Sequence, residues 1–129
     1  MASGRILIVD DERFFRDLFQ EMLTARGHQV RAAASGEEAL RVLAGDRFDL
    51  LVADLVMPGR SGLDLLGILQ REAPEVGVVI ITGHASIETA VKAMKLGAED
   101  YLGKPIDVEE LEVVLQKALE RKGLLEEAR

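Results

Sequence analysis

Three stretches of the chain are almost unbroken runs of aliphatic residues, namely Arg5–Val9, Asp49–Ala53 and Gly77–Ile81. None of them alternates apolar with polar residues, so each is typical of a parallel strand that is covered on both faces. Two weaker stretches, His28–Ala33 and Glu99–Leu102, are expected to form further strands. The pattern therefore predicts five strands.

Apolar residues at helical spacing occupy the segments between and after these strands. The residues expected to face inward from five helices are, in chain order, Phe15, Leu18, Phe19 and Met22; Ala39, Leu40 and Leu43; Leu63, Leu66 and Leu69; Ile87, Ala90, Val91 and Met94; and Leu111, Val114, Leu115 and Ala118. A capping box is expected at Ser35–Glu38, and Ser86 and Asp107 are expected to cap two later helices. Because strand and helix alternate five times, the pattern predicts an α/β fold with a parallel sheet and right-handed crossovers.

The length, composition and net charge exclude or disfavour several classes of protein. A length of 129 residues suits one compact domain, and with aromatic residues at only 4% its core must be mainly aliphatic. The net charge of -7 disfavours direct binding to nucleic-acid phosphates. The absence of cysteine excludes disulfides and thiolate sites. The apolar runs are too short to span a membrane, and the acidic residues at 10–12 come too early for a secretory signal, so we expect a cytoplasmic protein.

Polar and charged side chains stand where the expected strands end. Asp10 and Asp11 follow the first strand, Asp54 the third and Thr82 the fourth, and Lys104 comes shortly after the fifth. Ligands of open α/β sheets bind at the carboxyl ends of the strands. Three carboxylates held together repel one another unless a cation lies among them, and Mg²⁺ prefers oxygen ligands. Since Lys104 and Thr82 can bind an anion, we expect this edge to bind Mg²⁺ and a phosphoryl group.

Three of these residues also have an ordinary structural explanation when each is taken alone. Asp11 is then best explained as a helix N-cap, Thr82 as a turn residue and Lys104 as a solvated surface lysine. Their joint placement after successive strands is what favours a site.

The residues at the strand ends belong to longer motifs, which are, in chain order, Ile6-Leu-Ile-Val-Asp-Asp-Glu12, Asp54-Leu-Val-Met-Pro58 with Gly62, Ile81-Thr-Gly83 and Asp100-Tyr-Leu-Gly-Lys-Pro105. These motifs resemble those of the receiver domain of bacterial response regulators. The resemblance implies a flavodoxin-like, doubly wound (βα)5 fold whose five parallel strands have the order 2-1-3-4-5. It also implies a receiver domain over residues 1–120, and a phosphoryl group passed from a histidine kinase to Asp54.

The same resemblance assigns roles to the site residues. It implies that Asp11, Asp54 and the backbone carbonyl of Val56 bind Mg²⁺ directly, and that Asp10 binds it through water. Lys104 and Thr82 would contact the phosphoryl group, while the small Gly83 leaves its path open. Thr82 and Tyr101 would act as the switch, with Tyr101 moving inward. The peptide bond between Lys104 and Pro105 is expected to be cis.

The segment from Thr82 to Ala98 is most similar to the nitrogen-regulation class of enhancer-binding activators. Residues 121–129 then resemble the start of a helical linker toward an ATPase and DNA-binding output domain in a longer parent chain. The class is compatible with a homodimer. The expected output face comprises the fourth helix, the fifth strand and the fifth helix, with Lys92, Lys95, Glu99 and Glu112 as candidate surface residues.

Four further expectations concern single residues. Val56 cannot orient a water molecule, so we expect a long-lived phosphoryl-aspartate, whereas His84 could influence the hydrolytic water. His28 is expected to be structural, and the methionines at 22, 57 and 94 are expected to fill gaps in the core.

Three other functions compete with this interpretation. A haloacid-dehalogenase-like phosphohydrolase needs a second aspartate two residues after its nucleophile, where this chain has Val56. A flavodoxin-like FMN binder needs a Ser/Thr/Gly phosphate loop after the first strand, where this chain has Asp-Asp-Glu-Arg. A receiver-like interaction module would need no phosphorylation site, yet the expected site residues are all present.

Overall fold

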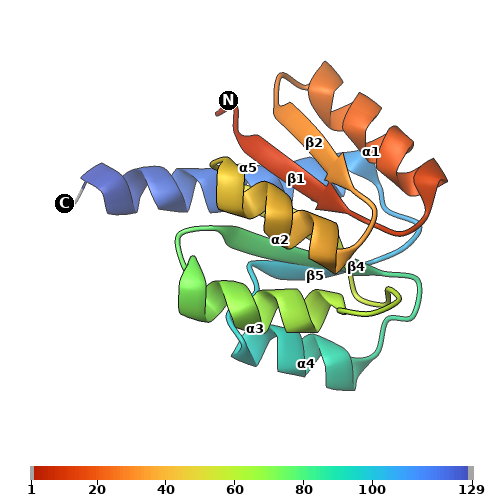
Figure 1. The fold of residues 1–129 in the computed structure, drawn as a ribbon. Coiled ribbons are helices and arrows are strands. Elements are labelled where there is room, and N and C mark those ends of the chain that lie inside the picture. The colour runs from red at the N-terminus through yellow and green to blue at the C-terminus, as the bar shows by residue number, and fades with distance from the viewer. Residues whose placement is uncertain (1, 128–129) are drawn as a thin grey trace.

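The computed structural model describes residues 2–127, which form a five-stranded parallel sheet flanked by helices (Figure 1). The elements are β1 (Arg5–Val9), α1 (Arg13–Ala25), β2 (Gln29–Ala33), α2 (Gly36–Gly45), β3 (Leu50–Asp54), α3 (Gly62–Glu72), β4 (Gly77–Thr82), α4 (Ile87–Lys95), β5 (Asp100–Gly103) and α5 (Val108–Glu127). The strand order is β2-β1-β3-β4-β5, with every neighbouring pair parallel. The predicted order 2-1-3-4-5 is therefore confirmed.

The position of each strand in the sheet follows from how apolar it is. The three unbroken aliphatic runs form β1, β3 and β4 at the centre, where nearly all their residues are buried. The mixed sequences form β2 and β5 at the two edges, where part of each strand meets solvent. A strand between two others must be apolar on both faces, whereas an edge strand need not be.

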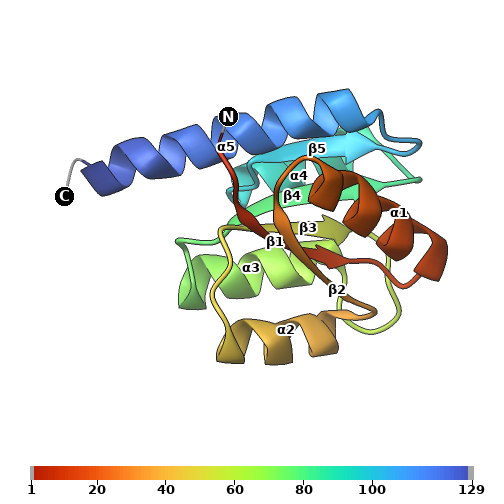
Figure 2. The same cartoon turned by 90° about the horizontal axis from the view of Figure 1, so that it is seen from above.

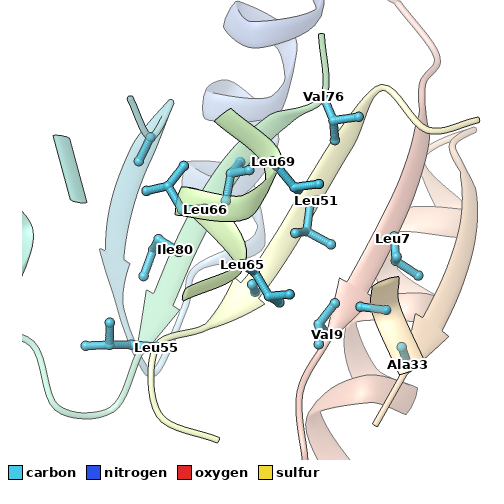
Figure 3. Packing of buried hydrophobic residues seen from close by; sticks show 14 of the residues in the cluster. Leu7, Val9, Ala33, Leu51, Leu55, Leu65, Leu66, Leu69, Val76 and Ile80 are labelled. Carbon is cyan, nitrogen blue, oxygen red and sulfur yellow. The ribbon is translucent and has the colours of Figure 1, made fainter. Parts of the chain in front are cut away.

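Helices cover both faces of the sheet, with α1 and α5 on one side and α2, α3 and α4 on the other (Figure 2). Successive strand residues point to opposite faces, so Ile6 and Ile8 join the α1–α5 core while Leu7 and Val9 join the other. Figure 3 shows the second core, where leucines of α3 pack onto β1, β3 and β4. These two aliphatic layers fix the strand ends that carry the polar residues.

Side-chain oxygens cap the starts of several helices. Ser86 caps α4 as predicted, and Ser61 with Asp64 forms a complete capping box on α3 that the sequence interpretation overlooked. At α2 the Ser35 hydroxyl accepts the Glu38 N–H, but the Glu38 carboxylate accepts the N–H of Ala34 instead of Ser35. The predicted box at Ser35–Glu38 is thus only half formed.

The predicted inward face of α4 is wrong. Ile87, Val91 and Met94 are 84%, 46% and 49% exposed, and the residue that α4 buries completely is Ala93. The physical reason is that this nine-residue helix meets the sheet beside the edge strand β5 through a small side chain, which leaves its larger apolar residues outside. Met94 is therefore not a core residue, whereas Met57 is buried as expected.

Glu112 is buried and does not belong to an exposed output face, so that prediction is wrong as well. The His28 Nε2 atom lies 2.9 Å from the Glu112 carboxylate, and the His28 Nδ1 atom accepts the N–H of Gly4. Both side chains are almost fully enclosed. These contacts join α5 to the start of β2 and to the N-terminal segment. The role that they give His28 is a structural one.

The last helix continues without a break past residue 120, and its end projects beyond the sheet (Figure 1). Past residue 120, Arg121 pairs with Glu99, and Lys122 donates a hydrogen bond to the Glu75 carbonyl oxygen. The start of a linker at residue 121 stays a prediction, and residues 128 and 129 lie outside the described part. Across residues 2–127, none of the helices has the length and apolar character that crossing a bilayer requires.

Candidate functional site

The parallel register brings the polar strand ends to one edge of the sheet. Val9 pairs with Ala53 and Asp54 pairs with Ile81, so Asp10, Asp54 and Thr82 follow one another across β1, β3 and β4. A cleft of about 500 Å³ opens beside them. Its lining residues are Asp11, Glu12, Phe15, Asp54, Val56, Gly83, His84, Lys104 and Pro105.

Lys104 joins the two buried carboxylates of the site. Its Nζ atom donates hydrogen bonds to Asp10 Oδ2 at 2.8 Å and to Asp54 Oδ2 at 3.3 Å. The other Asp54 oxygen, Oδ1, accepts the Val56 N–H at 3.4 Å. Asp10 is fully buried and Asp54 nearly so. An ammonium group between two enclosed carboxylates leaves one negative charge uncompensated at this point.

The carboxylates of four residues gather here, one more than the sequence interpretation named. Oxygens of Asp10, Asp11, Glu12 and Asp54 all lie within 4.8 Å of one another. Glu12 was overlooked, although it directly follows Asp10-Asp11 and so could have been found from its position. Carboxylate oxygens are hard donors of the kind that Mg²⁺ prefers. The single charge of Lys104 does not balance four carboxylates, so the group fits a divalent cation such as Mg²⁺.

The surroundings of Asp54 and Lys104 change their protonation. Burial raises the pKa of Asp54 above its usual value, and although the Lys104 charge acts against this, the nearby Asp10 charge adds to it. Burial alone would lower the pKa of Lys104, but its hydrogen bond and charge interaction with Asp10 outweigh that effect and raise it. At neutral pH Lys104 is charged, and ionising Asp54 costs more in the folded chain than in the unfolded one.

We expect Asp54→Asn to stabilise the metal-free protein at pH 7. A carboxyl whose pKa is higher in the folded state binds its proton more readily there, so stability falls as the pH rises from the unfolded to the folded pKa. The free-energy cost of ionising Asp54 in the folded protein is present in full above the folded pKa. It vanishes below the pKa of the unfolded chain, which is about 4. Urea unfolding of both proteins in chelator at pH 7 and at pH 4 measures it.

Added Mg²⁺ provides the control for this experiment. A ligand at a hundred times its dissociation constant stabilises the folded state by about 2.7 kcal/mol. The wild type should gain this stability and the variant much less, because it lacks one ligand. A variant less stable than the wild type at pH 7 in chelator would contradict the expectation.

The other predicted site residues occupy distinct positions. Thr82 is fully buried, and its hydroxyl accepts the N–H of His84 at 2.9 Å. The Tyr101 hydroxyl lies 2.6 Å from the Thr89 hydroxyl and accepts the Ser86 N–H, so Tyr101 is tied to the start of α4. The Lys104–Pro105 peptide bond is cis, as predicted.

Val56, Gly83 and His84 are exposed at the mouth of the cleft. A side-chain carbon added at Gly83 would meet no atom within 4 Å, so the space beside it is open. Of the predicted residues, those that line the cleft are Asp11, Asp54, Val56, Gly83, His84 and Lys104. Asp10 and Thr82 are fully buried at the adjoining strand ends, and the Tyr101 hydroxyl contacts α4 instead.

This combination of sheet order, strand-end carboxylates and lysine defines the response regulator receiver domain. The family of that description matches residues 6–116, and the chain belongs to it. Among curated relatives, the nitrogen assimilation regulatory protein NtrX of Azorhizobium caulinodans is 43% identical over 126 residues. The DNA-binding transcriptional regulator NtrC of Azospirillum brasilense is 35% identical over 119 residues.

Solved structures give the same result. A receiver domain protein of Clostridium thermocellum superposes with a TM-score of 0.90 at 35% identity, covering 95% of this chain and 98% of that one. NtrX of Brucella abortus superposes with a TM-score of 0.91 at 37% identity, covering 98% of this chain but 29% of that one.

The chain spans only about a quarter of the length of the curated relatives that it matches. It covers 96% of itself but 28% of the Azorhizobium NtrX, and 92% of itself but 25% of the Azospirillum NtrC. The match therefore concerns their receiver domains, and the rest of those proteins has no counterpart among these residues.

Proposed function

We propose that Asp54 is the phosphoacceptor of this receiver domain and that it takes a phosphoryl group from the phosphohistidine of a histidine kinase. The observation that supports this most directly is the position of Asp54. Its carboxylate ends the central strand β3, is nearly buried, faces the cleft and contacts a charged lysine. Receiver domains are regulatory phosphoacceptors and not turnover enzymes, so the domain itself is the substrate of the transfer.

In the proposed transfer, an Asp54 carboxylate oxygen forms a bond to phosphorus while the bond from phosphorus to the histidine nitrogen of the kinase breaks. The product is an acyl phosphate on Asp54 and a free histidine. The charge of the transferring group lies mainly on its three other oxygens. The Lys104 ammonium, already 3.3 Å from Asp54, neutralises part of that charge.

Mg²⁺ would be held by Asp11, Asp54 and the Val56 carbonyl oxygen, with Asp10 acting through water and Glu12 nearby. When bound, it supplies further positive charge to the phosphoryl oxygens. The four gathered carboxylates support this assignment. Burial and the nearby Asp10 charge raise the pKa of Asp54, and a bound cation would favour its ionised form.

The proposed switch involves Thr82 and Tyr101. A phosphoryl group on Asp54 offers new acceptors to the Thr82 hydroxyl, which now accepts the His84 N–H. If Thr82 turns toward the phosphoryl group, the β4–α4 loop moves and the space for an inward Tyr101 changes. Only contacts that differ between the two states can shift their populations. By analogy with the longer relatives, the output is an attached domain that controls transcription.

Incubation with acetyl phosphate and Mg²⁺, followed by intact mass measurement, tests the proposal. We expect the mass of one phosphoryl group to be added, none to be added in chelator, and the adduct to be removed by hydroxylamine, which attacks acyl phosphates. A mass that stays unchanged with Mg²⁺ would overturn the proposal. Turnover of a chromogenic phosphate monoester would instead favour the phosphohydrolase.

Val56 is expected to give the phosphoryl group a long lifetime. Its side chain is 55% exposed at the cleft and has no atom that could orient an attacking water. Val56→Gln places an amide there and should shorten the lifetime several-fold, as followed by the decay of the phosphorylated mass after the donor is removed. An equal or longer lifetime in the Gln variant would count against this assignment.

His84→Ala is measured in the same assay. His84 lines the cleft two residues after Thr82, and an imidazole there can accept a proton from the hydrolytic water. We expect its removal to lengthen the lifetime, and an unchanged decay rate would retire the role of His84.

A further inference from the structure

The ammonium group of Lys104 is held from a third side by an aromatic ring. Its Nζ atom lies 3.9 Å from the centroid of Phe15, in addition to its contacts with Asp10 and Asp54. Phe15 and Lys104 both line the phosphoryl cleft, although they are distant in sequence. The Lys104 side chain is only 8% exposed. Where water has been removed from an ammonium, the attraction of an aromatic face is at its strongest.

The Phe15 ring is fixed by its own neighbours. Phe15 stands in the first turn of α1, where its N–H donates to the Glu12 carbonyl oxygen. Its ring stacks on Phe19 with centroids 6.0 Å apart, and Phe19 is buried in the α1–α5 core. The Phe14 ring lies edge-on 5.3 Å away but is largely exposed, so the residue that anchors the Phe15 ring is Phe19. The ring is therefore anchored to the core and does not depend on Lys104 for its position.

A ring is suited to this third position because it attracts a cation without carrying a formal negative charge. A third carboxylate would hold Lys104 equally well, but it would also repel an arriving phosphoryl group and cancel the charge that the phosphoryl group needs. The contacts with Asp10 and Asp54 must loosen when phosphoryl oxygens compete for the ammonium. Phosphoryl oxygens do not replace the Phe15 ring, so the contact of Lys104 with this ring can persist during the transfer.

We propose that Phe15 is a positioning residue for the phosphoryl transfer, whose aromatic face holds the Lys104 ammonium at the cleft. This proposal rests on the proposed role of Lys104 toward the phosphoryl group. The competing explanation is that Phe15 is simply apolar cover, in which case any side chain of similar size would serve.

Three variants separate these explanations. Phe15→Leu keeps an apolar side chain but removes the ring, and Phe15→Tyr keeps the ring. Phe14→Leu makes the same change one residue earlier, at a side chain that is 69% exposed. Urea unfolding of each variant shows whether it is folded, and Phe15→Met replaces the Leu variant if that one is not.

The first measurement needs no phosphorylation. The ring current of Phe15 should shift the Lys104 side-chain NMR resonances of the wild type upfield. We expect this shift to persist in Phe15→Tyr and Phe14→Leu and to be lost in Phe15→Leu. This pattern tests whether the ring lies against Lys104 in solution, and the phosphorylation rate then separates positioning from apolar cover.

The second measurement is the rate of phosphorylation by acetyl phosphate with Mg²⁺. We expect Phe15→Leu to be slower by roughly tenfold, and Phe15→Tyr and Phe14→Leu to remain within about twofold of the wild type. Equal rates in Leu and Tyr variants, or Lys104 resonances that never sense the ring, would overturn the role of Phe15. A wild type that is not phosphorylated at all would overturn the proposed function instead, and the NMR shift would still report on the contact.

Discussion

Asp54→Asn is expected to abolish the uptake of a phosphoryl group from acetyl phosphate in the presence of Mg²⁺. The amide is almost the same shape as the carboxylate, so the fold and the cleft should persist, but an amide is a far poorer nucleophile. Asp10 is no substitute, because it is fully buried and its Oδ2 atom is held by Lys104 at 2.8 Å. Intact mass measurement over a time course should show no adduct under conditions that fully convert the wild type.

Asp17→Asn is the matched control for this experiment. Asp17 lies on the exposed surface of α1, where it pairs only loosely with Arg13. The control should incorporate a phosphoryl group at the wild-type rate. If Asp54→Asn were phosphorylated as fast as the wild type, the acceptor would be another side chain, and the assignment of Asp54 would have to be abandoned.

Gly62→Ala is expected both to destabilise the domain and to slow phosphorylation. A side-chain carbon at Gly62 would lie 2.5 Å from the carbonyl oxygen of Asp54 and 3.2 Å from a side-chain carbon of Ile80. The first contact is with backbone, so no rotation of a side chain relieves it. Forcing extra volume into a packed site costs about 1–3 kcal/mol, and here the displaced atoms belong to the acceptor residue itself. Urea unfolding and the phosphorylation time course measure the two effects.

Gly67→Ala tests the same substitution on the same helix. The nearest atom to its added carbon is a guanidinium nitrogen of Arg71 at 3.8 Å, which is an ordinary contact. In the interior of α3 alanine is favoured over glycine by about 1 kcal/mol, so this variant should be more stable and should be phosphorylated normally. If the two variants behaved alike, close packing at Gly62 would not be what constrains Asp54.

The sheet could be predicted because a strand that is buried on both faces carries the signal in its own residues. Arg5–Val9 and Gly77–Ile81 show it plainly, and the polar residues that follow such strands meet at one edge whatever the helices do. The face of α4 could not be predicted in this way. Which side of a short helix meets the sheet depends on its rotation about its own axis, and α4 buries Ala93 while Ile87 stays exposed.

Contacts between segments that are distant in the sequence could not be predicted either, because they depend on how the helices pack. In the sequence Glu112 looks like a surface residue, and only the packing of α5 brings it to His28. The contact of Phe15 with Lys104 depends on where α1 begins relative to the end of β5, and no spacing along the chain encodes it. Glu12 and the Ser61–Asp64 box differ, because their local motifs were visible and were overlooked.

The contact of Tyr101 with Thr89 has a practical consequence for spectroscopy. The chain contains a single tyrosine and no tryptophan, so its phenol fluorescence arises from one side chain at the junction of β5 and α4. A rearrangement of that junction should alter the intensity or the lifetime of this emission without any attached dye. The domain thus provides its own optical reporter of the transition.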